Sequence, residues 1–205
     1  MLHFPGVQLC IKTERLNINP ENILQPQIGR VLVSKPFLDD PYFKRTVILL
    51  CDHNEEGSFG FVLNKFVDMD LSDIQLNIPG ANLKLAIGGP VENKNVYYIH
   101  RHGPEMPGSV HLVDDIYMGG SFEDLKTLLS KPGFNPQNVR FFIGYSGWSD
   151  DQLLDELKSD SWYVATCTSD LIMNTEVEDL WKEVIKGMGG AYANLANFPL
   201  DPNMN

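Results

Sequence analysis

The sequence lacks the features that define several large classes of protein. It has no apolar run close to the ~18 residues that a membrane-spanning helix needs. Residues 1–11 carry no basic stretch typical of a signal peptide, so we expect a soluble, cytoplasmic protein with no membrane partner. The three cysteines are far apart and form no Cys-x-x-Cys pair, which argues against disulfides and thiolate zinc sites. We expect reduced, mostly buried thiols.

Basic residues are also scarce. The chain has 16 Lys and Arg against 27 Asp and Glu, which gives a net charge of −11. Because proteins gain affinity for DNA by neutralising phosphates, this balance disfavours a nucleic-acid partner. The local basic concentrations, at Lys44-Arg45 and around Arg101, are small.

The composition is that of a folded domain. The chain has 205 residues, of which 43% are hydrophobic, and shows no repeat or low-complexity tract. Residues 1–27 have no clear periodicity and predict an N-terminal arm, with a short helix around residues 20–24. We expect one α+β domain over residues 28–188 and a C-terminal tail over residues 189–205 that is either a strap over the surface or disordered.

Short β-rich runs fill the middle of the chain. Residues 46–51 are almost wholly apolar, which predicts a strand buried on both faces. A polar loop joins this run to residues 59–63, as in an antiparallel hairpin. Residues 83–87 and 96–101 flank a Gly-Gly-Pro turn and predict a second strand pair. Further strands are expected at residues 30–34, 139–145 and 162–167.

Three helices are predicted from their capping residues. Ser121, Ser149 and Thr175 each precede acidic or amide residues and then leucine or valine at helical spacing. Gly187 is expected to end the third helix in the C′ position.

The block Gly-Tyr-Ser-Gly-Trp at residues 144–148 lies between a predicted strand and a predicted helix. The nucleophile elbow of α/β-hydrolases occupies such a place, but it needs a small residue where Trp148 stands. No histidine follows His111, so a serine–histidine–acid triad in the usual order is not available to Ser146.

We therefore interpret this block as the start of a helix. Ser149 and Gln152 have the spacing of a capping box, and Trp148 and Leu153 that of a hydrophobic staple. The alternative is a ligand contact at this helix N-terminus, which suits an anion.

The histidines form one group in the sequence. His100 and His102 share a face of a strand, and with His111 and Asp114 or Asp115 they could bind a divalent metal. Nothing in the spacing makes three or four ligands converge, so we expect a solvated strand end, with no metal and no cofactor. The glycines at 88 and 89 match no phosphate-binding loop and predict positive φ or a close backbone approach.

Ordered blocks of sequence carry a family resemblance. They are Gly29-Arg30-Val31-Leu32-Val33, the Asp-Pro-Tyr-Phe-Lys-Arg-Thr-Val segment at 40–47, the glycine-rich run 57–64, Gly88-Gly89-Pro90-Val91, and residues 144–153. Together they resemble the bacterial YqgE/AlgH family over about residues 29–185. Lys65-Phe66 stands where members often have Arg-Pro, and Ser146 where many have Ala, which weakens a nucleophile role further.

The resemblance implies a strongly bent, largely antiparallel mixed β-sheet flanked by helices. It brings the label of transcriptional regulator and implies little about activity. From the absent signatures we expect a non-enzymatic binding or regulatory module that acts through a protein partner or a small ligand. Direct DNA binding and a hydrolase with a carboxylate or metal site are the alternatives. We expect the site where these loops converge, at Asn64, Gly88, Gly89, Pro90, Tyr145, Ser146, Trp148 and Gln152.

Overall fold

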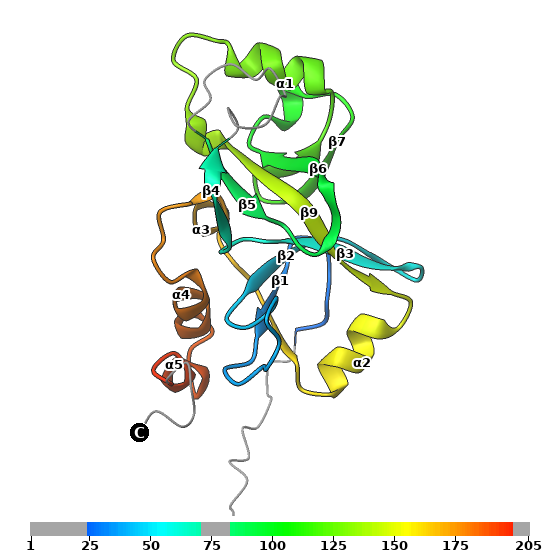
Figure 1. Ribbon diagram of the computed structural model, residues 1–205, viewed down its shortest axis with the longest axis vertical. Coiled ribbons are helices and arrows are strands. Elements are labelled where there is room, and N and C mark those ends of the chain that lie inside the picture. The colour runs from blue at the N-terminus through cyan, green and yellow to red at the C-terminus, as the bar shows by residue number, and fades with distance from the viewer. Residues whose placement is uncertain (1–23, 71–82, 199–205) are drawn as a thin grey trace, which may run out of the picture.

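Runs of β-branched and aromatic residues make the strands of one large sheet (Figure 1). The computed structural model describes residues 24–70 and 83–198. The strands are β1 (Val31–Ser34), β2 (Val47–Asn54), β3 (Gly57–Val62), β4 (Phe66–Asp70), β5 (Lys84–Ile87), β6 (Val91–His100), β7 (Ser109–Val113), β8 (Ile116–Gly119), β9 (Val139–Ser149) and β10 (Trp162–Ala165).

The strands follow the order β10-β1-β2-β3-β9-β6-β8-β7, and every neighbouring pair in this path is antiparallel. β5 lies off the path, parallel to β9 and antiparallel to β4. The predicted α+β class with a bent, largely antiparallel mixed sheet is confirmed.

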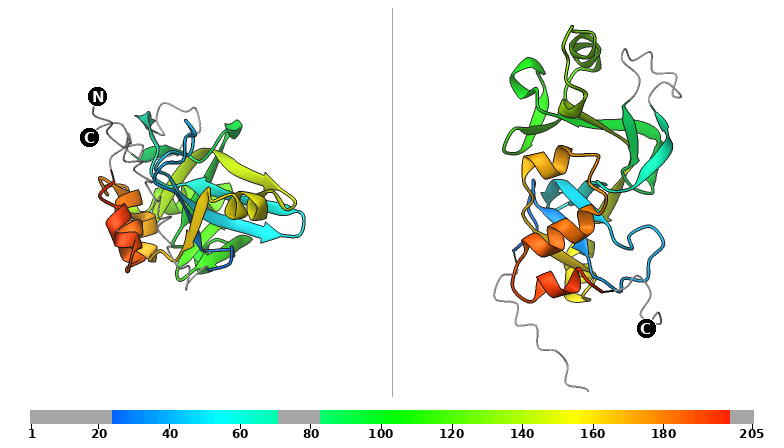
Figure 2. Two further views of the ribbon diagram at one scale, coloured as in Figure 1. Left: turned by 90° about the horizontal axis from the view of Figure 1, so that it is seen from below. Right: turned by 90° about the vertical axis from the view of Figure 1, so that its left-hand side faces the viewer.

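Helices cover the sheet in three places. They are α1 (Phe122–Leu129), α2 (Gln152–Lys158), α3 (Ser169–Met173), α4 (Leu180–Gly187) and α5 (Tyr192–Leu195). Figure 2 shows α3, α4 and α5 together along one side of the molecule, with α1 at one end. None of the helices in the described residues is long and apolar enough to cross a membrane.

Side chains of β1 and β2 are buried on both faces of the sheet. Val31 and Val33 pack in the cluster that contains Trp181 of α4, whereas Leu32 packs in the cluster that contains Leu153 of α2. Because successive residues of a strand point to opposite faces, two covered faces require an unbroken apolar run. This confirms the prediction for residues 46–51, all of which are buried.

A third cluster lies beneath α1. Leu125 of this helix packs with Tyr98 of β6 and Phe141 of β9. Ser121 caps the helix as predicted, since its side chain accepts a hydrogen bond from the Asp124 N–H at 3.3 Å.

β9 is the strand that joins the two halves of the sheet. Its first part lies between β5 and β6, with Ile143 opposite both Ile87 and Val96. Its last part pairs with β3, with Ser149 opposite Gly57. The predicted β5–β6 pair is therefore wrong, because both strands pair with β9.

Two predicted helix starts are also wrong. Pairing with β3 keeps the chain extended as far as Ser149, so α2 begins at Gln152, with Asp151 as its N-cap. The Thr175 cap is replaced by Asp179, whose side chain accepts the Lys182 N–H at 3.0 Å. Gly187 is the last residue of α4 and not its C′ residue.

Several elements carry no clear sequence signal. β4, β7, β8 and α3 were not predicted. Nor was α5, which lies within the expected tail and places Leu195 and Ala196 in the core. The predicted division into arm, domain and tail stays a prediction, and the helix expected around residues 20–24 falls almost wholly outside the described residues. Cys51 is buried and Cys167 half-buried, both as free thiols, while Cys10 lies outside the described part.

Glycines 88 and 89 let two backbones touch where β5 leads into β6. The Gly88 N–H donates to the Ile143 carbonyl at 2.8 Å, and the Gly88 carbonyl accepts from the Val62 N–H at 2.9 Å. A Cβ on Gly88 would lie 2.2 Å from the Gly144 oxygen, and one on Gly89 would lie 2.2 Å from the Tyr145 oxygen. No side chain fits between these segments.

We therefore expect Gly88→Ala to lower the free energy of unfolding by about 3 kcal/mol, because backbone must move to admit the methyl group. Gly187→Ala is the matched control, since its Cβ would meet nothing within 4 Å and its helical position favours alanine. We expect that variant to be about 0.5–1 kcal/mol more stable than the parent. Urea denaturation measures both, and equal stabilities for the two variants would contradict the close approach.

Candidate functional site

Four of the eight predicted site residues hold the fold together: Asn64, Gly88, Gly89 and Ser146. Asn64 fixes the loop before β2, because its Oδ1 accepts the Val47 N–H at 3.0 Å and its Nδ2 donates to the Arg45 carbonyl at 2.7 Å. Ser146 has no exposed surface, and its Oγ donates to the Gly88 carbonyl at 3.1 Å. This buried hydrogen bond connects β9 to the segment between β5 and β6.

Two further predicted residues attach α2 to the sheet. The indole N–H groups of Trp148 and Trp162 both donate to Glu156 Oε2, at 2.9 and 2.7 Å. Gln152 donates to the other oxygen of Glu156 at 3.0 Å and accepts the Ser149 N–H at 3.1 Å. One of the two hydrogen bonds of the predicted capping box is therefore present, although Ser149 is the last residue of a strand. Trp148 and Leu153, the two residues of the predicted hydrophobic staple, pack in the same core cluster.

The histidine group does not form a metal site. His100 was expected at a solvated strand end, but its side chain is buried, stacked beside Tyr117. Its Nε2 donates to the Gly119 carbonyl at 2.9 Å and its Nδ1 accepts the His102 N–H at 3.1 Å. Both ring nitrogens are therefore occupied.

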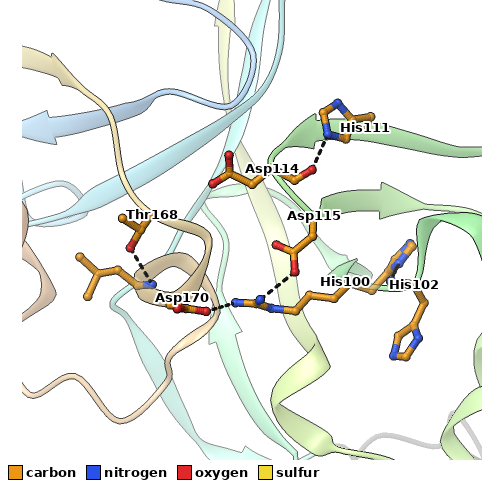
Figure 3. Close-up of polar contacts among 9 residues, drawn as sticks. His100, His102, His111, Asp114, Asp115, Thr168 and Asp170 are labelled. Atoms are coloured by element: carbon orange, nitrogen blue, oxygen red, sulfur yellow. Dashed lines mark hydrogen bonds and ion pairs between the residues drawn. The ribbon is translucent and has the colours of Figure 1, made fainter.

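The other members of the group have separate partners. Figure 3 shows His111 apart from His100 and His102, with its Nε2 donating to the Asp114 carbonyl at 2.8 Å. Asp115 instead accepts from Arg101, which also reaches Asp170 of α3, both at 2.7 Å. Across residues 24–70 and 83–198, no three His, Cys, Asp or Glu side chains converge on a metal position.

Gly88 and Gly89 cross β9 in close contact, and we call this contact the glycine crossing. A groove of about 610 Å³ lies beside it, where β9 is flanked by β3 and β6. Among the predicted residues, Tyr145 and Trp148 line it, while Pro90 is exposed outside it. The complete lining is Asp52, Asn54, Glu56, Gly57, Ser58, Phe59, Val91, Glu92, Tyr97, Tyr145, Gly147 and Trp148.

Aromatic rings make the wall of this groove. Tyr145 meets Phe59 and Tyr97 edge to face, with 5.8 Å between ring centroids in each pair. Phe59 and Tyr97 in turn contact Phe61, which stacks on Phe142 in the core at 4.7 Å. Because the wall continues into packed core, its rings are held in place.

The rim of the groove carries carboxylates, and Glu92 is held in an unusual conformation. It has φ +47°, in the left-handed region that non-glycine residues avoid, and it follows Val91, where the β6–β9 register shifts. Its Oε2 accepts from the Tyr97 hydroxyl at 2.6 Å and from Asn95 at 2.8 Å. The Tyr97 hydrogen bond, followed by that of Asn95, lowers the pKa of Glu92, so the group is ionised at neutral pH.

A serine and a histidine meet at the edge of the groove. Ser58 Oγ lies 2.7 Å from His53 Nδ1, and the two residues are direct partners across the β2–β3 hairpin. In the described part of the chain, no carboxylate contacts Nε2 of His53. The pair is therefore a cross-strand polar contact that lacks the third group of a catalytic triad.

Sequence reasoning missed most of this groove. Asp52, Phe59, Glu92 and Tyr97 come from three strands and share no motif. The β2–β3 pairing brings Asp52 beside Phe59, and the antiparallel register of β3 and β6 against β9 brings these residues to Glu92 and Tyr97.

These features define a class of α+β protein with a bent, largely antiparallel sheet and an aromatic groove where the central strand changes partners. Within this class the chain belongs to the AlgH-like family, whose model matches residues 31–193. It is 40% identical over 178 residues to a UPF0301 protein of Cytophaga hutchinsonii, covering 86% of this chain and 98% of that protein. A second UPF0301 protein, from Chlorobaculum tepidum, is 38% identical over 187 residues, covering 91% and 99%.

Solved structures share the fold. A crystal structure of a Corynebacterium diphtheriae protein superposes with a TM-score of 0.72 at 24% identity, covering 88% of this chain and 96% of that one. The solution structure of the AlgH protein from Pseudomonas aeruginosa gives 0.67 at 24% identity, covering 86% and 97%.

His100 should make stability depend on pH. Burial lowers the pKa of its imidazole below the ordinary 6.5, against the opposing effect of the Gly119 hydrogen bond. Below pH 6.5 the unfolded chain therefore binds a proton that the folded chain does not. The free energy of unfolding should fall as pH decreases from 6.5 towards the depressed folded-state pKa.

The test is urea denaturation at about pH 7.5 and about pH 5.5. His100→Gln keeps a donor for the Gly119 carbonyl but cannot titrate, so its stability should fall less than that of the parent between the two values. The same decrease in both proteins would show that other groups cause it.

Proposed function

We propose that this chain is a non-enzymatic binding module that holds a small ligand in the groove between β3, β6 and β9. The groove itself carries the proposal. Its volume of about 610 Å³ lies within the roughly 300–1,000 Å³ typical of small-molecule sites. Its lining combines four aromatic residues with five polar ones, so apolar surface and polar groups that can orient a ligand meet in one groove.

The described residues favour binding over catalysis. Ser146 is buried behind the groove, and the Ser58–His53 pair has no orienting carboxylate among the described residues. The histidine group is divided among separate partners. A reaction would need a nucleophile or base with its orienting group facing a cavity, and no such set lines the groove in residues 24–70 and 83–198.

The family label of transcriptional regulator is compatible with a binding module that acts through a ligand or partner. Direct DNA binding is opposed by the net charge of −11 and by the carboxylates of the groove. We therefore propose that any regulatory role depends on ligand binding and involves no direct contact with nucleic acid.

The test is a fragment screen followed in amide NMR spectra. With a set of small aromatic and aliphatic fragments as the probe, we expect saturable shifts at Gly57, Phe59 and Gly147. Tyr145→Leu should weaken binding of these fragments by about tenfold, because it removes a wall ring. Tyr42→Leu is the control, since Tyr42 is 57% exposed and lies outside the groove.

Tyr145→Leu could also disturb folding, so a second variant keeps the test decisive. Gly147→Val adds bulk to the groove at an exposed strand position without positive φ, where its Cβ would first meet the Tyr145 ring at 3.1 Å. Loss of binding in both variants supports the groove. Fragment shifts that cluster elsewhere, or that survive in both variants, contradict it.

A further inference from the structure

The charges of the groove are one-sided. Asp52, Glu56 and Glu92 line it, and the described residues that line it include no Lys or Arg. A ligand that enters this groove therefore meets a negative potential.

The wall of the groove is also suited to positive charge. The faces of aromatic rings carry negative electrostatic potential and attract ammonium and guanidinium groups. Phe59, Tyr97 and Tyr145 form a connected set of rings with neighbouring centroids 5.8 Å apart in the two Tyr145 pairs. The same rings provide apolar surface for a hydrocarbon chain.

Glu92 is preorganised as an acceptor at this wall. Its backbone is held in the left-handed region, and the Tyr97 hydroxyl and the Asn95 amide both donate to Oε2. In the described part of the chain, Oε1 has no hydrogen-bond partner. Backbone strain of this kind persists where the surroundings enforce it, and it is common at ligand sites.

We infer that the groove selects a small organic cation, in which an ammonium or guanidinium head is attached to an apolar chain. This inference rests on the proposed function, because it names the ligand class of the same groove. The head lies against the rings and is neutralised by Glu92 and the other carboxylates that line the groove, while the chain covers the aromatic wall. A bare metal ion fits less well, since the described residues offer no three converging ligands.

The experiment compares two probes of the same length and shape, hexylammonium and hexan-1-ol, which differ in charge. Titration followed by amide NMR should show hexylammonium shifting Gly57, Phe59 and Gly147 saturably, at least about tenfold more tightly than hexan-1-ol. Added NaCl should weaken hexylammonium binding and leave hexan-1-ol unaffected.

A pair of charge-matched variants identifies the carboxylate. Glu92→Gln should weaken hexylammonium binding about fivefold or more, because it removes the charge and keeps the shape. Glu178→Gln makes the same change in net charge at an exposed position outside the groove, so it should leave binding unchanged. This control separates the groove from general attraction to an acidic protein.

Three outcomes would overturn the inference. They are equal affinity for the two probes, hexylammonium shifts spread over the acidic surface, and equal effects of the two Glu→Gln changes. If both probes bind the groove equally, the binding-module proposal stands and charge selection is wrong. If neither probe shifts groove residues while the fragment screen also fails there, both proposals are wrong.

Discussion

The fold depends on one close backbone approach, where Gly88 and Gly89 lie directly against Gly144 and Tyr145 of β9. Hydrogen bonds at this crossing connect Gly88 to β9 on one side and to Val62 at the end of β3 on the other. Because no side chain separates the segments, β9 can leave its pairing with β5 and continue in pairing with β3. The two halves of the sheet are arranged around this point (Figure 1).

The groove is a consequence of the same crossing. Successive side chains of β9 point to opposite faces of the sheet. Ser146 therefore points into the core and donates to the Gly88 carbonyl, whereas its neighbour Tyr145 lines the groove. The irregular start of β6 then presents Glu92 to the Tyr97 hydroxyl. The sequence blocks that carry the family resemblance thus serve both packing and the groove. Gly88, Gly89 and Ser146 hold the crossing together, whereas Phe59, Tyr145 and Trp148 line the groove.

Elements determined by local sequence patterns could be predicted, whereas pairings between strands far apart in the sequence could not. The buried run of β2, the β2–β3 hairpin and the Ser121 cap follow from apolar spacing and capping chemistry. The parallel pairing of β5 with β9 has no local signal, and turn-forming glycines concealed the extension of β9 to Ser149. Of the predicted site, Tyr145 and Trp148 line the groove, whereas Asp52 and Glu92 needed the strand register to be found.

Native-state amide hydrogen exchange at the crossing tests this account most directly. The Val62 and Gly88 amides, which donate to the Gly88 and Ile143 carbonyls, should exchange only through global unfolding. Their opening free energies should then equal that of the Leu50 amide, which donates to Arg30 within the core of β1 and β2. Exchange at the crossing through local opening, at a free energy well below that of Leu50, would contradict the claim that the fold depends on this contact.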